Sequence, residues 1–210
     1  MNCNQGNCRK LRAFVMAGAL LAAGMMVQTT AQAQTGTAAK AKAKTADSMA
    51  AESPSATYSK LLKIMSSEVI GAAEAMPADK YDFAPTNGNF SGVRTFGDQV
   101  KHLASANYGF FRAFGVPGVP DRKTLAALKG KEEIVQALKD SYAYAQKSID
   151  TMTPQNAFET VGSGEGRMTR AGLAAFCVAH SMDHYGQMVE YLRMNSIVPP
   201  ASRNQGQGGM

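Results

Sequence analysis

The sequence contains three histidines, and their positions are the feature that most directly suggests chemistry. His180 and His184 are four residues apart, in the segment Ala-His-Ser-Met-Asp-His-Tyr-Gly-Gln. On a helix, residues four apart lie on one face with their Cβ atoms about 6 Å apart, so two imidazoles at this spacing can bind one metal ion. His102 lies much earlier in the chain, so a metal site that includes it needs a second helix.

A helical projection places the pair on the face that turns toward a core. At about 100° per residue, His180 and His184 share a sector with Leu173 and Tyr191. Two imidazoles there cannot both be protonated without repulsion and a desolvation cost, so they need shared hydrogen bonds or one metal ion. The alternative is that the histidines pack as separate side chains. For His102, which lies beside a strip of small residues formed by Ala106, Gly109 and Ala113, both interpretations stay open.

Three neighbours of the pair each have two interpretations. Cys177 precedes His180 by one turn and is either a fourth ligand or, as we prefer, a small core residue. Gln187 either hydrogen-bonds a metal-bound water or an imidazole, or is a surface or interhelical amide, which we favour. Asp183 either orients an imidazole or is solvated, and we prefer the solvated state.

Hydrophobic periodicity predicts four helices that would position these residues. They cover 56–76, 96–114, a stretch from about 124 or 130 to 152, and 169–195. Thr95 has the position of an N-cap for the second helix. No segment has strand character of any length, so we expect an all-α four-helix bundle. The first and third connections are long enough to contain short helical or lid segments, or to allow a crossed-over helix order.

The N-terminal residues have the pattern of a secretory signal peptide. Basic residues precede an uncharged, mostly apolar run over 13–27, and Ala31-Gln-Ala33 forms an Ala-x-Ala cleavage site. The run is too short for a membrane span, so an uncleaved anchor is the less favoured alternative. We expect a secreted or periplasmic protein with no membrane association after cleavage. Its parts are a signal peptide (1–33), a flexible linker (34–55), a helical domain (56–200) and a disordered tail (201–210).

Cleavage would change both the charge and the cysteine content. Three of the 22 basic residues and none of the 16 acidic ones would leave, so the net charge would fall from +6 to 19 − 16 = +3. The remaining basic residues are spread along the helices, and we expect no nucleic-acid partner. Cys3 and Cys8 would also leave, so the mature chain could not form an internal disulfide through Cys177.

Three motifs occur together in the helical part of the chain. They are the His-x3-His and Gly-Gln pattern within 178–193, the histidine-containing segment 96–103, and Asp-Lys-Tyr-Asp-Phe-Ala-Pro over 79–85. Together they resemble the DinB-like superfamily, which includes the YfiT-like metal-dependent hydrolases, and the resemblance covers 56–200. It implies a four-helix bundle of unusual connectivity. It also implies a divalent metal cofactor, most often zinc or nickel, with His102, His180 and His184 as its ligands.

These expectations leave several functions open. The first is a metal-dependent hydrolase or thiol S-transferase that acts on a small molecule. Its catalytic residues stay unassigned, because no residue stands out as a general base or nucleophile. Export weakens the transferase version, since low-molecular-weight thiols are mainly cytosolic. The second is a non-catalytic periplasmic metal- or ligand-binding bundle, and the third is a bundle whose histidines only pack. A homodimer is also left open.

Overall fold

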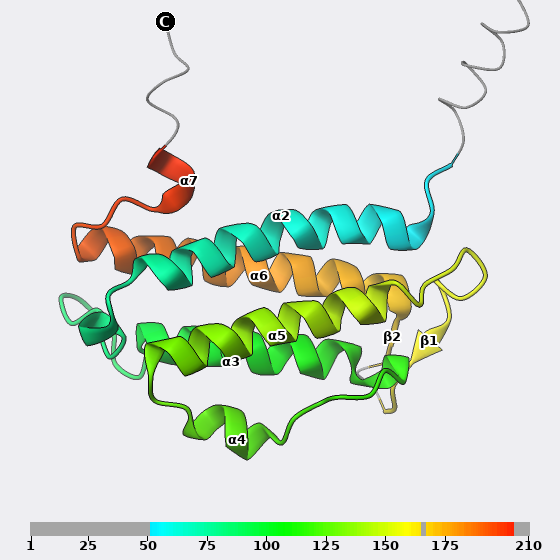
Figure 1. The fold of residues 1–210 in the computed structure, drawn as a ribbon, viewed down its shortest axis with the longest axis horizontal. Coiled ribbons are helices and arrows are strands. Elements are labelled where there is room, and N and C mark those ends of the chain that lie inside the picture. Colours follow the sequence, from blue (N-terminus) through cyan, green and yellow to red (C-terminus); the bar gives the residue numbers. More distant parts are fainter. Residues whose placement is uncertain (1–50, 165–166, 204–210) are drawn as a thin grey trace, which may run out of the picture. The chain divides into compact units, whose positions relative to one another are not determined.

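Four long helices form a bundle in the structure, a computed structural model that describes residues 51–164 and 167–203 (Figure 1). This confirms the all-α four-helix bundle predicted from the sequence. No helix within these two stretches is long and apolar enough to cross a lipid bilayer. The predicted signal peptide over 1–33, the linker up to residue 50 and the tail from 204 lie outside the described residues. The long helices are α2 (Pro54–Ala75), α3 (Phe96–Phe111), α5 (Lys131–Ile149) and α6 (Arg170–Met194).

Side-chain caps fix the start of the two helices that contain histidines. Thr95 Oγ1 accepts a hydrogen bond from the Asp98 amide at 3.1 Å, which confirms the predicted N-cap of α3. Thr169 Oγ1 accepts from an amide in the first turn of α6 at 3.0 Å. The far end of α3 tightens into the 3-10 turn η2 (Arg112–Phe114). Gly115 follows at φ 81°, a left-handed conformation that favours glycine and ends the helix.

The connections between the long helices contain short elements. η1 (Ala78–Lys80) follows α2, and α4 (Arg122–Ala127) precedes α5. The third helix was predicted to start at about residue 124 or 130, and these positions lie close to the starts of α4 and α5. We expected no strand, and the structure corrects this. β1 (Thr160–Val161) pairs antiparallel with β2 (Met168–Thr169), but two residues are too few for an alternating pattern to show in the sequence. The short helix α7 (Pro200–Arg203) includes residues 201–203, which the sequence analysis places in the tail.

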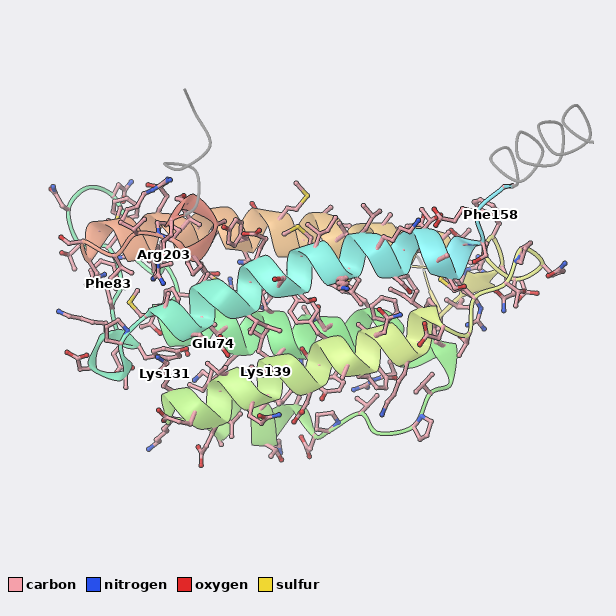
Figure 2. All side chains as sticks on the ribbon, turned by 45° about the horizontal axis from the view of Figure 1, so that its top comes forward. Glu74, Phe83, Lys131, Lys139, Phe158 and Arg203 are labelled. Atoms are coloured by element: carbon pink, nitrogen blue, oxygen red, sulfur yellow. The ribbon has the colours of Figure 1, made fainter. Side chains whose placement is uncertain are left out.

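Helices that follow one another in the chain do not all lie next to one another in the bundle. α2 packs against α5 and α6, and α3 also packs against α5 and α6, so α2 and α3 lie on one diagonal (Figure 1). The two long connections therefore cross the bundle, one of the outcomes that their length allowed. Glu74 joins α2 to α5, since its carboxylate pairs with Lys139 at 2.6 Å and its carbonyl accepts from Lys131 at 2.9 Å (Figure 2).

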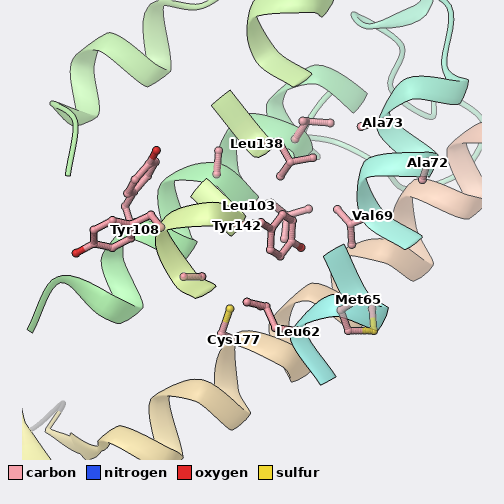
Figure 3. Packing of buried hydrophobic residues seen from close by; sticks show 14 of the residues in the cluster. Leu62, Met65, Val69, Ala72, Ala73, Leu103, Tyr108, Leu138, Tyr142 and Cys177 are labelled. Atoms are coloured by element: carbon pink, nitrogen blue, oxygen red, sulfur yellow. The ribbon is translucent and has the colours of Figure 1, made fainter. Parts of the chain in front are cut away.

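The hydrophobic core lies between the four helices (Figure 3). Val69 of α2, Leu103 of α3 and Leu138 of α5 are completely buried there. Burial of each such side chain stabilises the fold by about 1.5–3 kcal/mol relative to an exposed one. The order of the helices sets α3 directly against α6, and this pairing brings the histidines of the two helices into reach of one another.

Tyr81 anchors the first long connection beneath the bundle. Its ring is 4 % exposed and packs edge to face on Phe96, with ring centroids 5.4 Å apart. Its hydroxyl donates to the Ala73 carbonyl at 2.7 Å, and burial raises the pKa of the phenol.

Replacing Tyr81 with phenylalanine removes this hydroxyl and leaves the buried Ala73 carbonyl without its hydrogen-bond donor. We expect the free energy of unfolding to fall by about 1–2 kcal/mol, measured by urea denaturation.

Tyr58→Phe is the matched control, because the Tyr58 hydroxyl makes no hydrogen bond to any described residue and its side chain is only partly buried. We expect a change within about 0.5 kcal/mol for this variant. Equal losses in the two variants would contradict the anchoring role of the Tyr81 hydroxyl.

Candidate metal centre

The structure brings all three histidines together between α3 and α6. One nitrogen from each of His102, His180 and His184 lies within 4.8 Å of the corresponding atoms of the other two. The Nε2 atoms of His102 and His180 are 3.1 Å apart. The ring centroid of His184 lies 4.7 Å from that of His102 and 4.5 Å from that of His180. His102 thus reaches the pair across the helix interface, and the three imidazoles form one cluster.

His184 is held in one orientation by Gln99, a residue of α3. The Nδ1 atom of His184 lies 2.6 Å from Gln99 Oε1. An amide oxygen only accepts hydrogen bonds, so the proton of the neutral imidazole is on Nδ1. The Nε2 lone pair of His184 is therefore the one that is free to bind a metal ion. Such a hydrogen bond on the far nitrogen is the usual way in which proteins orient a histidine ligand.

A chain of amides fixes the orientation of Gln99 in turn. Gln99 Nε2 donates to Gln187 Oε1 at 2.7 Å, and Gln187 Nε2 donates to Asp183 Oδ2 at 3.1 Å. Because the Asp183 carboxylate only accepts, it directs the NH₂ group of Gln187 toward itself and the oxygen toward Gln99. The same logic directs the oxygen of Gln99 toward His184. The direction of each hydrogen bond in this chain is therefore set at its exposed end, by one carboxylate.

This chain of hydrogen bonds shows which groups two neighbours of the pair contact. Gln187 is an interhelical amide, as we favoured, and it acts on His184 through Gln99. Asp183 is exposed, as expected, but it also accepts the last hydrogen bond of the chain. Gln99 was not among the site residues predicted from the sequence. The available signal was a polar residue one turn before His102 on a helix whose inner face is mostly apolar, with Asn107 as its other buried polar side chain.

Burial keeps the three imidazoles neutral. His184 is 5 % exposed, and burial, together with the nearby His180 and His102, lowers its pKa to about 4. Burial also lowers the pKa of His102 and of His180. At neutral pH each ring therefore has an unprotonated nitrogen, which is the form of histidine that binds metal ions.

The donor set and its spacing fit a transition metal. Two ligands of a tetrahedral zinc ion, at 2.0–2.1 Å from the metal, lie about 3.3 Å apart, close to the 3.1 Å between the Nε2 atoms of His102 and His180. Two unprotonated nitrogens at this distance repel unless a proton or a cation lies between them. His180 Nδ1 is buried without a hydrogen-bond partner among the described residues, so no contact forces the proton of His180 onto Nε2.

The cluster has an apolar side and an open side. On the apolar side, the Phe110 ring packs edge to face on His180 at 5.2 Å and on Phe176 at 5.3 Å. His102 also lines a cavity of about 550 Å³ between α3 and α4. The remaining lining residues are Arg94, Asp98, Lys101, Ser105, Arg122, Lys123, Leu125 and Ala126.

Cys177 lies outside the cluster of ligand atoms. Its thiol is completely buried, and its Sγ donates to Asn107 Oδ1 at 3.4 Å. Burial raises the pKa of this thiol to about 12. The preferred interpretation of Cys177 as a small core residue is confirmed, and no thiolate is available there to act as a fourth ligand.

Comparisons with known proteins agree with the architecture. The model of the DinB superfamily matches residues 61–188, which include all three histidines. A DinB-like protein from Bacillus cereus has a similar structure, with a TM-score of 0.59 and 12 % identity over 68 % of this chain and 93 % of that one. A DinB-like protein from Bacillus subtilis gives a TM-score of 0.52 and 12 % identity over 70 % and 99 % of the two chains. No curated protein matches. On the match to the family model, this chain belongs to the DinB superfamily.

Proposed function

We propose that the chain binds one divalent transition metal ion, zinc or nickel, through His102, His180 and His184, and acts as a metal-dependent enzyme on a small molecule. The observation that carries the proposal is the convergence of three imidazole nitrogens within 4.8 Å. Three protein ligands leave a fourth position for water or substrate, as in catalytic zinc sites. When bound, the metal supplies Lewis-acid chemistry that lowers the pKa of a water or thiol.

The residues of the chain have separate roles in this proposal. His102, His180 and His184 hold the ion, and Gln99 orients His184. Phe110 excludes water from one side of the cluster. His102 also lines the cavity, which offers a path by which a substrate reaches the cluster. The reaction would be hydrolysis or transfer of a thiol to a small electrophile. We favour hydrolysis, because we also propose that the protein is exported, and low-molecular-weight thiols are mainly cytosolic.

A non-catalytic metal-binding bundle is the alternative. A structural zinc site is closed by four protein ligands, whereas the donor cluster among the described residues contains three histidines and borders a cavity. Cobalt substitution distinguishes the two. If a coordination position is open, azide or a small thiol added to the cobalt protein changes its visible absorption spectrum. A spectrum that does not respond would favour the closed, non-catalytic site.

Metal analysis tests the binding itself. The full chain is expressed with its own N-terminus, purified without a chelator or a histidine tag, and analysed by mass spectrometry for metal content and intact mass. We expect about one equivalent of zinc or nickel per chain, and essentially none in the variant H102A/H180A/H184A. Circular dichroism of the variant checks that the helices persist. The intact mass of protein from the periplasmic fraction is expected to place the new N-terminus at Gln34.

Two outcomes would contradict the proposal. If neither protein contains metal, even after zinc or nickel is added back, the enzymatic function is refuted. If the triple variant retains as much metal as the natural chain, the ion is bound elsewhere and the histidines only pack. The single variant His102→Ala refines the result, because a site made by the α6 pair alone would keep its affinity.

A further inference from the structure

The cavity beside His102 is lined by an excess of positive charge. Four basic residues border it, and Asp98 is the one acidic residue among its lining. Asp98 already pairs with Lys101, whose Nζ lies 2.9 Å from the carboxylate. The cations that have no ion-pair partner among the described residues are Arg94, Arg122 and Lys123.

These three cations project from anchored backbone. The Arg94 carbonyl accepts a hydrogen bond from the Tyr191 hydroxyl at 3.0 Å, which ties this segment to α6. Asp121 caps α4 by accepting from the Lys123 amide at 2.7 Å, and so fixes the first turn of that helix, which contains Arg122. Arg122 Nε also donates to Ser105 Oγ at 3.4 Å, which directs its head group toward α3.

The positive charges also act on the metal-binding cluster. Burial is the largest cause of the lowered pKa of His102, and the charges of Arg94 and Arg122 add to it. Arg94 also lowers the pKa of His180 and of His184. His102 itself lines the cavity, so a negative group bound there would lie beside the cluster. Arginine is well suited to bind such a group, because its planar head donates two parallel hydrogen bonds to a carboxylate or phosphate.

We infer that the cavity between α3 and α4 binds the negatively charged group of the substrate, a carboxylate or phosphate held by Arg94, Arg122 and Lys123. The inference rests on the proposed metal-dependent function and names its substrate class, a small organic anion. Arg94 comes from the segment before α3 and Arg122 from the first turn of α4, and both line this cavity, so the inference places one oxyanion between them. The uncharged part of the molecule then extends past His102 toward the metal ion.

Calorimetry with succinate tests the inference, with the uncharged succinamide as the matched probe. We expect succinate to bind the natural chain and succinamide to bind much more weakly. In the variant R94E/R122E, succinate affinity is expected to fall at least about tenfold, because charge-assisted hydrogen bonds are lost and two charges are reversed. The control K63E/K147E has the same net charge, but its substitutions lie outside the lining of the cavity, and it is expected to bind succinate as the natural chain does.

A second variant separates the anion site from the metal site. H180A/H184A removes two metal ligands and leaves every lining residue of the cavity in place. We expect it to bind succinate and to lack metal, whereas R94E/R122E keeps its metal content. If succinate binding is lost in H180A/H184A and unchanged in R94E/R122E, the anion binds the metal ion, and the inference is overturned while the proposed function stands. Equal loss in R94E/R122E and in K63E/K147E would also overturn it, because net charge alone would then explain binding.

Discussion

Replacing Gln99 with leucine is expected to weaken metal binding about 10- to 100-fold while all three histidines stay in place. Gln99 Oε1 accepts the hydrogen bond from His184 Nδ1 at 2.6 Å, and leucine has a similar size but no acceptor. Without it, His184 is free to rotate or to move its proton to Nε2, the nitrogen that would bind the metal. Competition with a chromophoric chelator for zinc at neutral pH measures the loss, and circular dichroism verifies the fold.

Gln99→Glu is the matched control for this substitution. The glutamate keeps an acceptor for His184 Nδ1, so we expect it to retain most of the affinity that leucine loses. Gln187→Leu removes only the contact that orients Gln99, so its effect should be smaller than that of Gln99→Leu. If the leucine and glutamate variants at position 99 lose the same affinity, Gln99 matters for packing and not as an acceptor.

The metal-free protein is expected to lose stability as the pH falls from about 6.5 to about 4. The pKa of His184 drops from the ordinary value of 6.5 to about 4 on folding, mainly through burial. Between these values the unfolded chain binds a proton that the folded chain does not, so acid favours unfolding. The loss from His184 is on the order of 2–3 kcal/mol and is complete below the folded-state pKa. Urea denaturation at several pH values, with metal removed, measures it.

The variant His184→Gln isolates this contribution. It removes the titrating ring but keeps a polar side chain, and the acidic residues that titrate in the same range are unchanged. Its stability is expected to fall less steeply over this pH interval, although its absolute stability at pH 7 differs. Parallel curves for the two proteins would show that the protonation of His184 is not linked to folding.

Much of the architecture could be predicted from local sequence. The N-cap at Thr95 and the start of the last helix near Thr169 follow from side chains that bond amides within their own first turn. The spacing of His180 and His184 is also a local property, because the helix alone sets it. Periodicity was sufficient for these elements because each helix buries one face along its length, and most residues of that face are apolar.

The features that could not be predicted from the sequence depend on contacts between distant residues. Gln99 gains its role only because α3 lies against α6, where Gln187, 88 residues away, accepts its amide proton. The basic cavity joins Arg94 to Arg122 through the placement of α4, which has only six residues and no strong periodicity. The strand pair before α6 is too short to show alternation.

The diagonal path of the chain has a consequence for biosynthesis. His102 and His180 meet across a separation of 78 residues, and any N-terminal piece that ends before α6 contains one of the three ligands. Closing so long a loop costs entropy before the contact is gained, so the site forms late, when the last long helix docks. If the site binds a metal ion as proposed, a growing chain would offer it only one ligand until α6 is made, and metal insertion would follow completion of the fold.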